Sequence, residues 1–599
     1  MSLFKNYPVL TAFPIINLLF CSDLFAANIY ADNTLSENCS GNYSVEARRC
    51  SGSDGKAFRT IQAAINGSAV GDVIYMRDGT YREISIDIPE SKNGTAWTEG
   101  NFTTLRSYPG EWAKIDATGL TATGGLNSGV IVHAEGFGTG SDSQYTEYWK
   151  LSNFEVTGGG AGISIKCRHV KMHYLYIHDN GRAGVSNLQS GITTVNPQYL
   201  EVKYSYFKDN VNAAEPNRNN AHILLDGDYR DGTSNGGEGE SWIERASTHH
   251  NEIAYNYFEL TGSNFNGDHI GFRHKNQQRF GTNGRDPNDP DFRALGDYGD
   301  KFHHNIVVGS RESIATGQDF VQVYNNITDS VINIGRSGDL PVTYHHVVYN
   351  NTVRVDPIMD QSAGITGYIS FSGTGGNEVP PITNHYDNLP QRTVHEHAWF
   401  YNNISDDTGS NFNDVPFRFH RDMPSNATNM DTDNVDLVVE NNFIHNNANP
   451  IDISIGNKGS GVCAQTGMQV SDFNTCSETW RGVDAGTVRN WKNKSAGLYI
   501  GDTGAAQYIT NHAFKLDDTK TICTGGRSGN HPYLIGVRLP GYVGATNPND
   551  YAWVSGVFVD VRSTNWLMAQ NEENPSWIEK AESQPGVCKA PPKPPKPGA

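Results

Sequence analysis

Apolar and polar residues alternate over short stretches of this chain, and one short motif recurs. It consists of an apolar or aromatic run, an asparagine, and a second apolar run, as in IAYNYF, FHHNIVV, VQVYNNI, VVYNNTV, WFYNNIS and VVENNFI. The aligned asparagines are Asn256, Asn305, Asn326, Asn351, Asn403 and Asn442, at separations of 49, 21, 25, 52 and 39 residues. Two intervals define a unit of 21 to 25 residues, and the longer ones fit doubled units or units with inserted loops.

Upstream, KLSNFEV, HYLYIHDN and VKYSYFKDN continue the motif less strictly and place Leu175 and Ser205 at the position of the asparagines. Short strands repeated at this period are typical of a β-solenoid, in which each strand pairs with its counterpart one turn away. Asparagines at a fixed position of each turn would then stack and form hydrogen bonds along the axis. We therefore expect a structural role for the asparagine column.

Residues 53–83, SDGKAFRTIQAAINGSAVGDVIYMRDGTYRE, resemble the opening of right-handed parallel β-helix proteins of bacterial surfaces and of secreted polysaccharide-degrading enzymes. There, FRTIQAAI resembles a capping helix and GDVIYMRDGTYRE resembles the first coil. The resemblance implies an all-β fold, a right-handed parallel β-helix (β-solenoid) over roughly residues 55–457, with a helix near 57–66. It leaves function open, because this fold hosts lyases, hydrolases, epimerases and adhesins.

The two ends of the chain differ from the repeated part. Lys5, the apolar run VLTAFPIINLLF and the pair Ala26-Ala27 predict a secretory signal peptide over residues 1–27, hence an extracellular or periplasmic protein. That run is shorter than the roughly 20 residues of a membrane span, and no later segment is long enough. We expect the β-helix to occupy 28–457, followed by a C-terminal cap or small disulfide-bearing domain (458–588) and a Pro/Lys-rich tail (589–599).

The spacing of the eight cysteines favours disulfides over a metal site. Cys39 with Cys50, and Cys463 with Cys476, are close enough in sequence to pair, and Cys523 with Cys588 is the remaining distant pair. Cys167 lies in a strand-like run and is expected to be a buried free thiol. No CxxC spacing occurs, and no metal site is assigned.

Charge narrows the range of partners. With 65 acidic and 46 basic residues the net charge is −19, which disfavours binding to nucleic acid or to an anionic membrane. Counting forward from each asparagine to the next strand nevertheless predicts a column of outward side chains that is largely basic. Its members are Asp226, Arg273 with Lys275, Arg336, and Arg418 with His420 close by.

This basic column predicts an extended anionic ligand, such as a uronate-containing or sulfated polysaccharide. We expect the protein itself to be a monomer. Residues 268–311 support the anionic ligand with seven basic and six acidic residues, against the acidic background of the chain. The long segments after Asp226 and Lys275 carry aromatic residues that could stack on sugars (Tyr229, Trp242, Phe280 and Tyr298). The alternative is a solvated ladder of cations balanced by nearby acidic residues.

Histidines and acidic residues of the same zone have structural alternatives as well. Pairs recur at His249-His250, His303-His304 and His345-His346, and their repetition favours stacking over metal binding. Asp286, Asp289 and Asp291 form an oxygen-rich DPNDPD segment that lacks the full EF-hand pattern. A Ca²⁺ loop and a solvated loop fit that segment equally well, so no cofactor is assigned.

The segment GFRHK resembles the arginine-bearing strand of the alginate lyase and chondroitinase B family, and GSRESIATGQDFVQVYNNI resembles the coil that follows it. The resemblance implies a catalytic role for Arg273 and a substrate-binding role for Arg311. The family's lysine base, one coil earlier, has no counterpart in ERASTHHNEI. The candidate bases are therefore His249, His250, Lys275 and His274.

A lyase needs a cation at the uronate carboxylate, a base and an acid for the leaving group. A glycoside hydrolase on the same fold would instead need two carboxyl groups, for which Asp226, Asp228 and Asp268 are candidates. A surface or carbohydrate-binding protein would need the fold alone. The sequence favours the lyase and leaves the other two open, with Arg311, Arg336, Arg418, His420, Asp226 and Asp268 as candidate substrate-binding residues.

Overall fold

A computed structural model describes the chain from residue 27 to residue 540, with gaps. The described residues are 27–121, 129–133, 145–181, 188–211, 219–226, 248–261, 269–275, 299–310, 312–316, 320–334, 346–355, 369–373, 398–407, 417–421, 437–440, 442–445, 451–455, 488–489, 492–494, 528–530 and 538–540. The predicted signal peptide, the tail and the cysteines from Cys463 onward lie outside them.

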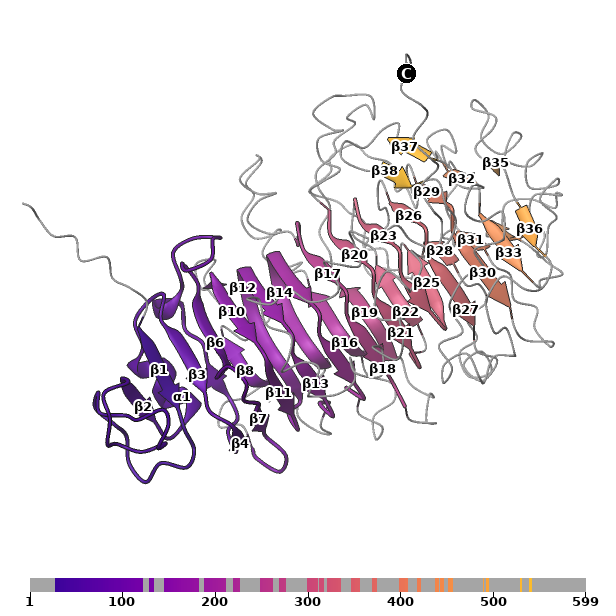
Figure 1. The fold of residues 1–599 in the computed structure, drawn as a ribbon. Helices are drawn as coiled ribbons and strands as arrows, with labels where there is room; N and C mark the ends of the chain where they lie inside the picture. The colour runs from indigo at the N-terminus through magenta and orange to yellow at the C-terminus, as the bar shows by residue number, and fades with distance from the viewer. Residues whose placement is uncertain are drawn as a thin grey trace, which may run out of the picture.

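Almost every described strand belongs to one of three ladders of parallel pairings (Figure 1). Ladder I holds β1 (Asn28–Ala31), β3 (Val73–Met76), β6 (Thr103–Ser107), β10 (Trp149–Ser152), β17 (Glu252–Ala254), β20 (Lys301–His303), β23 (Gln322–Tyr324), β26 (Val347–Tyr349), β29 (Ala398–Tyr401), β32 (Leu437–Glu440) and β35 (Val488–Arg489). Two short strands, β2 (Lys56–Phe58) and β9 (Thr146–Glu147), pair beside it.

Ladder II holds β5 (Ile86–Asp87), β8 (Gly129–His133), β16 (Asn219–Asp226), β19 (His269–Lys275), β22 (Glu312–Thr316), β25 (Val331–Ile334), β28 (Ile369–Gly373), β31 (Phe417–Arg421) and β34 (Ile451–Ile455). The long strands β12 (Ala161–His173) and β14 (Leu188–Lys203) run through ladder II and then ladder I, which joins the two into one 24-stranded sheet.

Ladder III is a separate 12-stranded sheet. Its members are β4 (Gly79–Tyr81), β7 (Ala113–Asp116), β11 (Phe154–Thr157), β13 (Tyr176–His178), β15 (Tyr206–Lys208), β18 (Tyr257–Glu259), β21 (Ile306–Val308), β24 (Ile327–Thr328), β27 (Thr352–Val355), β30 (Ile404–Asp407), β33 (Phe443–His445) and β36 (Lys492–Lys494). One antiparallel pair, β37 (Ser528–Asn530) with β38 (Arg538–Pro540), lies apart from the ladders.

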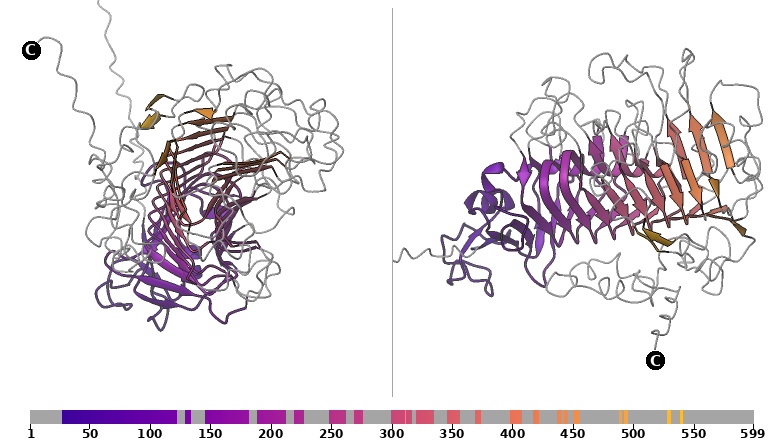
Figure 2. Two further views of the ribbon diagram at one scale, coloured as in Figure 1. Left: turned by 90° about the vertical axis from the view of Figure 1, so that its right-hand side faces the viewer. Right: turned by 90° about the horizontal axis from the view of Figure 1, so that it is seen from above.

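The chain visits the ladders in a fixed order, as β16, β17 and β18 illustrate by lying in ladders II, I and III before β19 returns to ladder II. Each coil therefore contributes one strand to each of three faces, and Figure 2 shows the stacked coils from the end and from above. The prediction of a parallel β-helix is confirmed. Because strand side chains alternate, every second position points into one continuous core.

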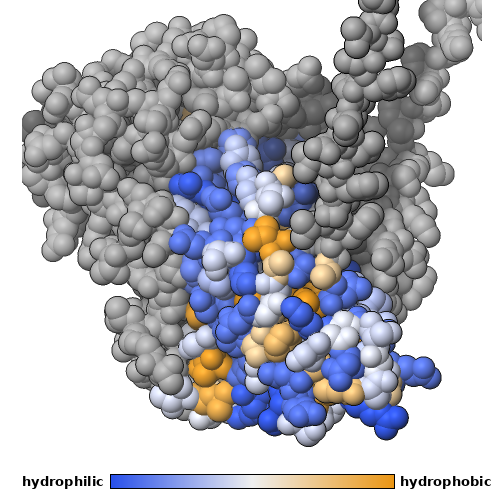
Figure 3. All heavy atoms as spheres, turned by 90° about the vertical axis from the view of Figure 1, so that its left-hand side faces the viewer, coloured by the Kyte–Doolittle hydropathy of each residue, from blue (hydrophilic) through white to orange (hydrophobic). Residues whose placement is uncertain are grey.

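The N-terminal end carries the short helix α1 (Ile61–Gly67), close to the predicted 57–66. It begins later than predicted because Lys56–Phe58 pairs with β1 as a strand. The hydroxyl of Thr60 accepts the backbone N–H of Ala63, and the carboxylate of Glu83 accepts the first two N–H groups of the helix. The described surface at this end is mostly hydrophilic (Figure 3), with Val70 as its exposed large hydrophobic side chain.

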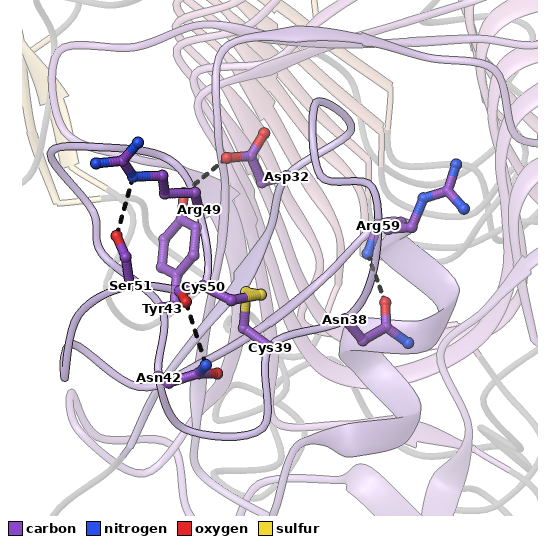
Figure 4. Close-up of a disulfide and its surroundings, with 9 residues drawn as sticks. All are labelled: Asp32, Asn38, Cys39, Asn42, Tyr43, Arg49, Cys50, Ser51 and Arg59. Atoms are coloured by element: carbon purple, nitrogen blue, oxygen red, sulfur yellow. Dashed lines mark hydrogen bonds between the residues drawn. A yellow bond between two sulfur atoms is a disulfide. The ribbon is translucent and has the colours of Figure 1, made fainter.

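The predicted Cys39–Cys50 disulfide is confirmed and closes a loop beside β1 (Figure 4). Next to it, Asp32 is buried and accepts hydrogen bonds from the Tyr43 hydroxyl and the Arg48 guanidinium. Burial opposes ionisation of Asp32, but these partners and Thr34 lower its pKa to about 2. Cys167 is a buried free thiol, as predicted, and burial raises its pKa.

The asparagine column forms as predicted at the bend between ladders I and III. The side-chain Oδ1 of Asn305, Asn326, Asn351, Asn403 and Asn442 each accepts both the backbone N–H and the Nδ2 of the preceding asparagine, at 2.8–3.2 Å. Each Nδ2 also donates to a main-chain carbonyl of the preceding coil, such as Phe302 for Asn326. Ser205 and Leu175 continue the column through hydrogen bonds, which confirms their predicted equivalence.

From Leu175 to Asn403, the residue before each column position has a positive φ, although none is glycine. Tyr174, Tyr204, Tyr255 and His304 adopt φ between 54° and 59°, and their rings stack at centroid distances of 5.0–5.3 Å. Histidines thus stack on tyrosines of neighbouring coils, while the two rings within a pair such as His303-His304 meet edge to face. Stacking along the axis offsets the cost of the left-handed conformation in these bulky residues.

The ladders extend beyond Asn442, the last asparagine of the column. Val488 pairs with Val439 in ladder I, and Lys492 pairs with Phe443 in ladder III. Strands of the parallel helix therefore occur within 458–588, the range that the sequence analysis assigned to a C-terminal cap or domain. No helix in the described part of the chain is long and apolar enough to cross a membrane.

Candidate active site

Four of the candidate residues lie on two neighbouring strands of ladder II, Asp226 on β16 and Arg273, His274 and Lys275 on β19. Arg273 in β19 pairs with Leu224 on one side and Ala315 on the other. Asp226 pairs with Lys275, two residues further along the strand. The predicted column, which placed Asp226 level with Arg273, is therefore shifted by two residues at this point.

The register also corrects the predicted continuity of the basic column. Following the pairings from Arg273 gives Ala315, Asn333 and Ser370 before the next cation, Arg418. Arg273 and Arg418 do share one column, but three uncharged residues separate them. His420 pairs with Ser372 and belongs to a parallel column two residues away.

Arg273 stands between two side chains that point into the core. Phe272 is buried and stacks on Phe302 of the following strand, β20, at a centroid distance of 4.4 Å. His274 is buried as well, and its ring meets that of Phe272 edge to face at 4.9 Å. Because neighbouring residues of a strand point to opposite faces, Arg273 projects outward, where it is partly exposed.

The His274 side chain is fully enclosed and anchored at both ring nitrogens. Nε2 lies 2.8 Å from Oδ2 of Asp300, and Nδ1 lies 2.6 Å from the Thr316 hydroxyl. Asp300 is itself held by Asn251, whose backbone N–H and Nδ2 both donate to Oδ1 at 2.9 Å. Three side chains outside β19, those of Asp300, Thr316 and Asn251, thus hold His274 and with it the strand that carries Arg273.

A further imidazole lies close to this group. His346 is fully buried, and burial together with the nearby charge of His274 lowers the pKa of His346 to about 3. His346 is therefore neutral throughout the physiological range. No local sequence pattern indicates this role for Asp300, Thr316 and Asn251, because their partners lie 26 to 49 residues away in the chain.

His250 lies at a different point of the coil, in the bend that leads into ladder I. It is half-buried, with φ 55°, and its ring stacks on that of Tyr199 at 4.5 Å. Tyr199 in turn stacks on His169, and His169 on Tyr148, at 4.6 and 4.8 Å. Since each inner ring has a neighbour on both faces, this column presents ring edges rather than faces for contact.

Ladder III carries a separate polar cluster on another face. Glu155 lies 2.8 Å from Lys114 Nζ and 2.9 Å from His178 Nε2, and His178 Nδ1 lies 2.6 Å from Asp179. Burial alone would raise the pKa of Glu155, but His178 and Lys114 lower it to about 2. Burial opposes the charge of His178, yet Asp179 and Glu155 raise its pKa. The basic and acidic side chains of this cluster therefore pair with one another.

Several predicted residues fall outside the described side chains. Asp226, Lys275, Arg418 and His420 are described by register alone. Arg311, Arg336, Asp268, the DPNDPD segment and the aromatic residues of the long loops lie outside the described residues. Among the side chains that the structure does describe, no group of three or more His, Cys, Asp or Glu residues could hold a metal ion.

Comparisons with known proteins gave structural similarities at low identity. No family model matches the sequence, and no curated protein matches it. Pectate lyase Pel9A is 12% identical, covering 68% of this chain and 82% of its own, with a TM-score of 0.34. The PL6 family polysaccharide lyase Pedsa3628 from Pseudopedobacter saltans is 13% identical, covering 73% and 91%, with a TM-score of 0.37. A tailspike protein of E. coli bacteriophage HK620, in complex with a pentasaccharide, is 12% identical, covering 76% and 66%, with a TM-score of 0.41.

Proposed function

We propose that this protein is a secreted polysaccharide lyase that cleaves an anionic, uronate-containing or sulfated polysaccharide by β-elimination on the outer face of ladder II. The observation that carries the proposal is the position of Arg273. Its guanidinium projects from a strand whose inner side is locked by Phe272 and by the His274–Asp300 hydrogen bond. The backbone that carries this cation is therefore held firmly, which favours preorganisation for charge that develops during a reaction.

In the elimination, a base removes the proton beside the uronate carboxyl group, and the glycosidic oxygen leaves. Arg273 would bind that carboxylate through paired N–H groups and stabilise the negative charge that builds up on it. Lys275 is our choice of base, since strand alternation is expected to put it on the same face as Arg273. Neighbouring cations lower the pKa of a lysine and so favour its neutral, basic form.

The two histidine candidates differ in how well they suit direct chemistry. His274 has a side-chain exposure of 0% and two hydrogen-bond partners, which favours a positioning role beneath Arg273. His250 is partly exposed, but its Nδ1 lies 2.7 Å from Nδ1 of His249 and its ring is engaged in stacking. Arg311, Arg336, Arg418 and His420 remain proposed contacts to sugars further along the chain of the substrate.

One alternative has an observation of its own. Asp226 and Lys275 are register partners on adjacent strands, so an acidic residue is paired with the proposed base. In a glycoside hydrolase, Asp226 would act with a second carboxylate such as Asp228 or Asp268. In a lyase, Asp226 would serve only to orient Lys275 or a sugar hydroxyl.

Two substitutions separate these chemistries. Arg273→Ala should lower kcat by about 10²–10³, the effect of removing a preorganised donor to developing charge, with a smaller change in KM. Asp226→Asn keeps the shape of the side chain and should lower kcat less than about tenfold in a lyase. Steady-state rates on polygalacturonate, alginate and chondroitin sulfate measure both. An inactive Asp226→Asn beside an active Arg273→Ala would rule out the lyase.

A further inference from the structure

The outer face of ladder II carries a second cation in line with the candidate site. Following the pairings from Lys275 toward the N-terminus gives Asp226, Val195 and then Lys166. Lys166 is thus three strands away from Lys275 in one column. At about 4.8 Å per strand the two positions are about 14 Å apart, a span that suits an oligosaccharide rather than one sugar.

Lys166 is a buried cation on the outer side of its strand. Ile163 and Ile165 point into the core, so Ser164 and Lys166 point outward. The Lys166 residue is nevertheless only 6% exposed. Its ammonium lies 4.6 Å from the centre of the Tyr145 ring, and among the described residues no carboxylate pairs with it.

An ammonium removed from water without an anion is costly, and a ring face compensates for only part of that cost. Within the described part of the chain, nearby charges do not supply an anion for Lys166. Arg168 lies over the same Tyr145 ring, at 3.7 Å, and brings a second positive charge. Glu147 is the register partner of Arg168, and the two interact electrostatically. The two described side chains that lie over the Tyr145 ring are therefore both cations.

We propose that Lys166, with Arg168 and Tyr145, forms a remote subsite that binds an anionic group of the same polysaccharide, a carboxylate or sulfate several sugars from the bond that is cleaved. The inference rests on the proposed function, because it takes the substrate to be an anionic chain that runs along the helix axis. The ammonium of Lys166 supplies hydrogen bonds and charge, and the Tyr145 ring holds both cations in place.

The test is affinity electrophoresis of the full chain through gels that contain polygalacturonate, alginate or chondroitin sulfate, with dextran as the uncharged reference. Lys166→Met should raise the Kd for long anionic chains about tenfold or more, the effect of losing one charge-assisted contact. Lys166→Arg keeps the charge and should stay within about threefold of the wild type. Lys208→Met, on ladder III, removes the same charge from another face and should leave the Kd unchanged.

Chain length and thermal stability provide two further readouts. A short oligomer that fills only the positions around Arg273 should be cleaved by Lys166→Met with unchanged kcat and KM, whereas long chains should show a raised KM. Without polysaccharide, Lys166→Met should melt at the same or a higher temperature than the wild type, because it removes a buried ammonium that pairs with no carboxylate among the described residues. A lower melting temperature would mean that Lys166 is a structural residue and would overturn the inference.

The outcomes distinguish this inference from the proposed function. Retardation and cleavage by the wild type, with equal retardation of Lys166→Met, would overturn the remote subsite and leave the lyase intact. A wild-type protein that neither binds nor cleaves any of the three polysaccharides would defeat the proposed function and the subsite together.

Discussion

Two columns of side chains run along the same β-helix and differ in whether one residue type is repeated from coil to coil. Asn256, Asn305, Asn326, Asn351, Asn403 and Asn442 repeat one residue at one inner bend, and each amide is bonded to its neighbours in the column. The outer column through Arg273 changes from coil to coil, passing through Thr193, Leu224, Ala315, Asn333, Ser370 and Arg418.

The difference shows where this architecture can carry chemistry. A bend that is buried in every coil must satisfy the same backbone groups each time, so asparagine recurs from Asn256 to Asn442. An outer position has no such requirement, so its residue type changes from coil to coil, and in this column Arg273 is partly exposed whereas Leu224 and Ala315 are buried. The buried His274–Asp300–Asn251 group has a feature of each column. It lies in the core like the asparagines, but it occurs at one position along the helix axis.

The largest expected effect lies in the inner column. Asn326→Ala leaves the N–H groups of Asn305 and the carbonyl of Phe302 without their partner inside the core. We expect the free energy of unfolding to fall by about 3 kcal/mol, as for more than one unsatisfied buried group. Urea titration followed by circular dichroism measures it. A loss below about 1 kcal/mol would mean that the column is not needed for stability.

A smaller effect is expected on ladder III, where the cluster around Glu155 should make stability depend on pH. The lowered pKa of Glu155 stabilises the fold above pH 4.5, and this contribution is lost as the pH falls from 4.5 toward about 2. The raised pKa of His178 stabilises the fold below pH 6.5 and is lost as the pH rises above that value. The joint contribution is greatest between pH 4.5 and 6.5.

Glu155→Gln should therefore lower the free energy of unfolding by about 2 kcal/mol within that window, and by less outside it. Melting temperatures between pH 3 and 9 on the wild type and the variant give the profile, with exposed Glu46→Gln as the control. A pH-independent difference would show that the carboxyl group contributes shape rather than charge.

The smallest effect is expected from the outer column. Asn333 allows the same residue type to be compared at an outer position and at the inner bend. Asn333 follows Asn326 by seven residues, and its Nδ2 makes a long hydrogen bond of 3.4 Å to Glu312. Asn333→Ala should lower the free energy of unfolding by about 1 kcal/mol, clearly less than Asn326→Ala. Equal losses in the same urea titration would remove the distinction between the two columns.

The sequence predicted the inner architecture well because the asparagine motif is part of the hydrogen bonding that builds it. Ser205 and Leu175 could be aligned with the asparagines for the same reason, since the bend keeps one geometry in every coil. The Cys39–Cys50 pair was also predictable, because its loop is short and other partners are distant in sequence.

The register of ladder II could not be read from the motif, because the number of residues between the asparagine and the outer column varies. Arg273 follows Asn256 by 17 residues, Ala315 follows Asn305 by 10, and Asn333 follows Asn326 by 7. Insertions at the bend absorb the difference, and this is why Asp226 was aligned two residues away from its partner. The contacts of His274 are made with Asp300 and Thr316, which lie 26 and 42 residues away in the chain, and no local pattern indicates them.

The central claim is that ladder II supports β-elimination, and the chemistry of the new chain ends tests it most directly. Elimination creates a double bond in the sugar at the new non-reducing end, which absorbs ultraviolet light, whereas hydrolysis adds water and creates none. Incubation of the wild type with polygalacturonate, alginate and chondroitin sulfate should raise the ultraviolet absorbance in step with new reducing ends on one of them. New reducing ends without that absorbance would contradict the account and establish hydrolysis instead.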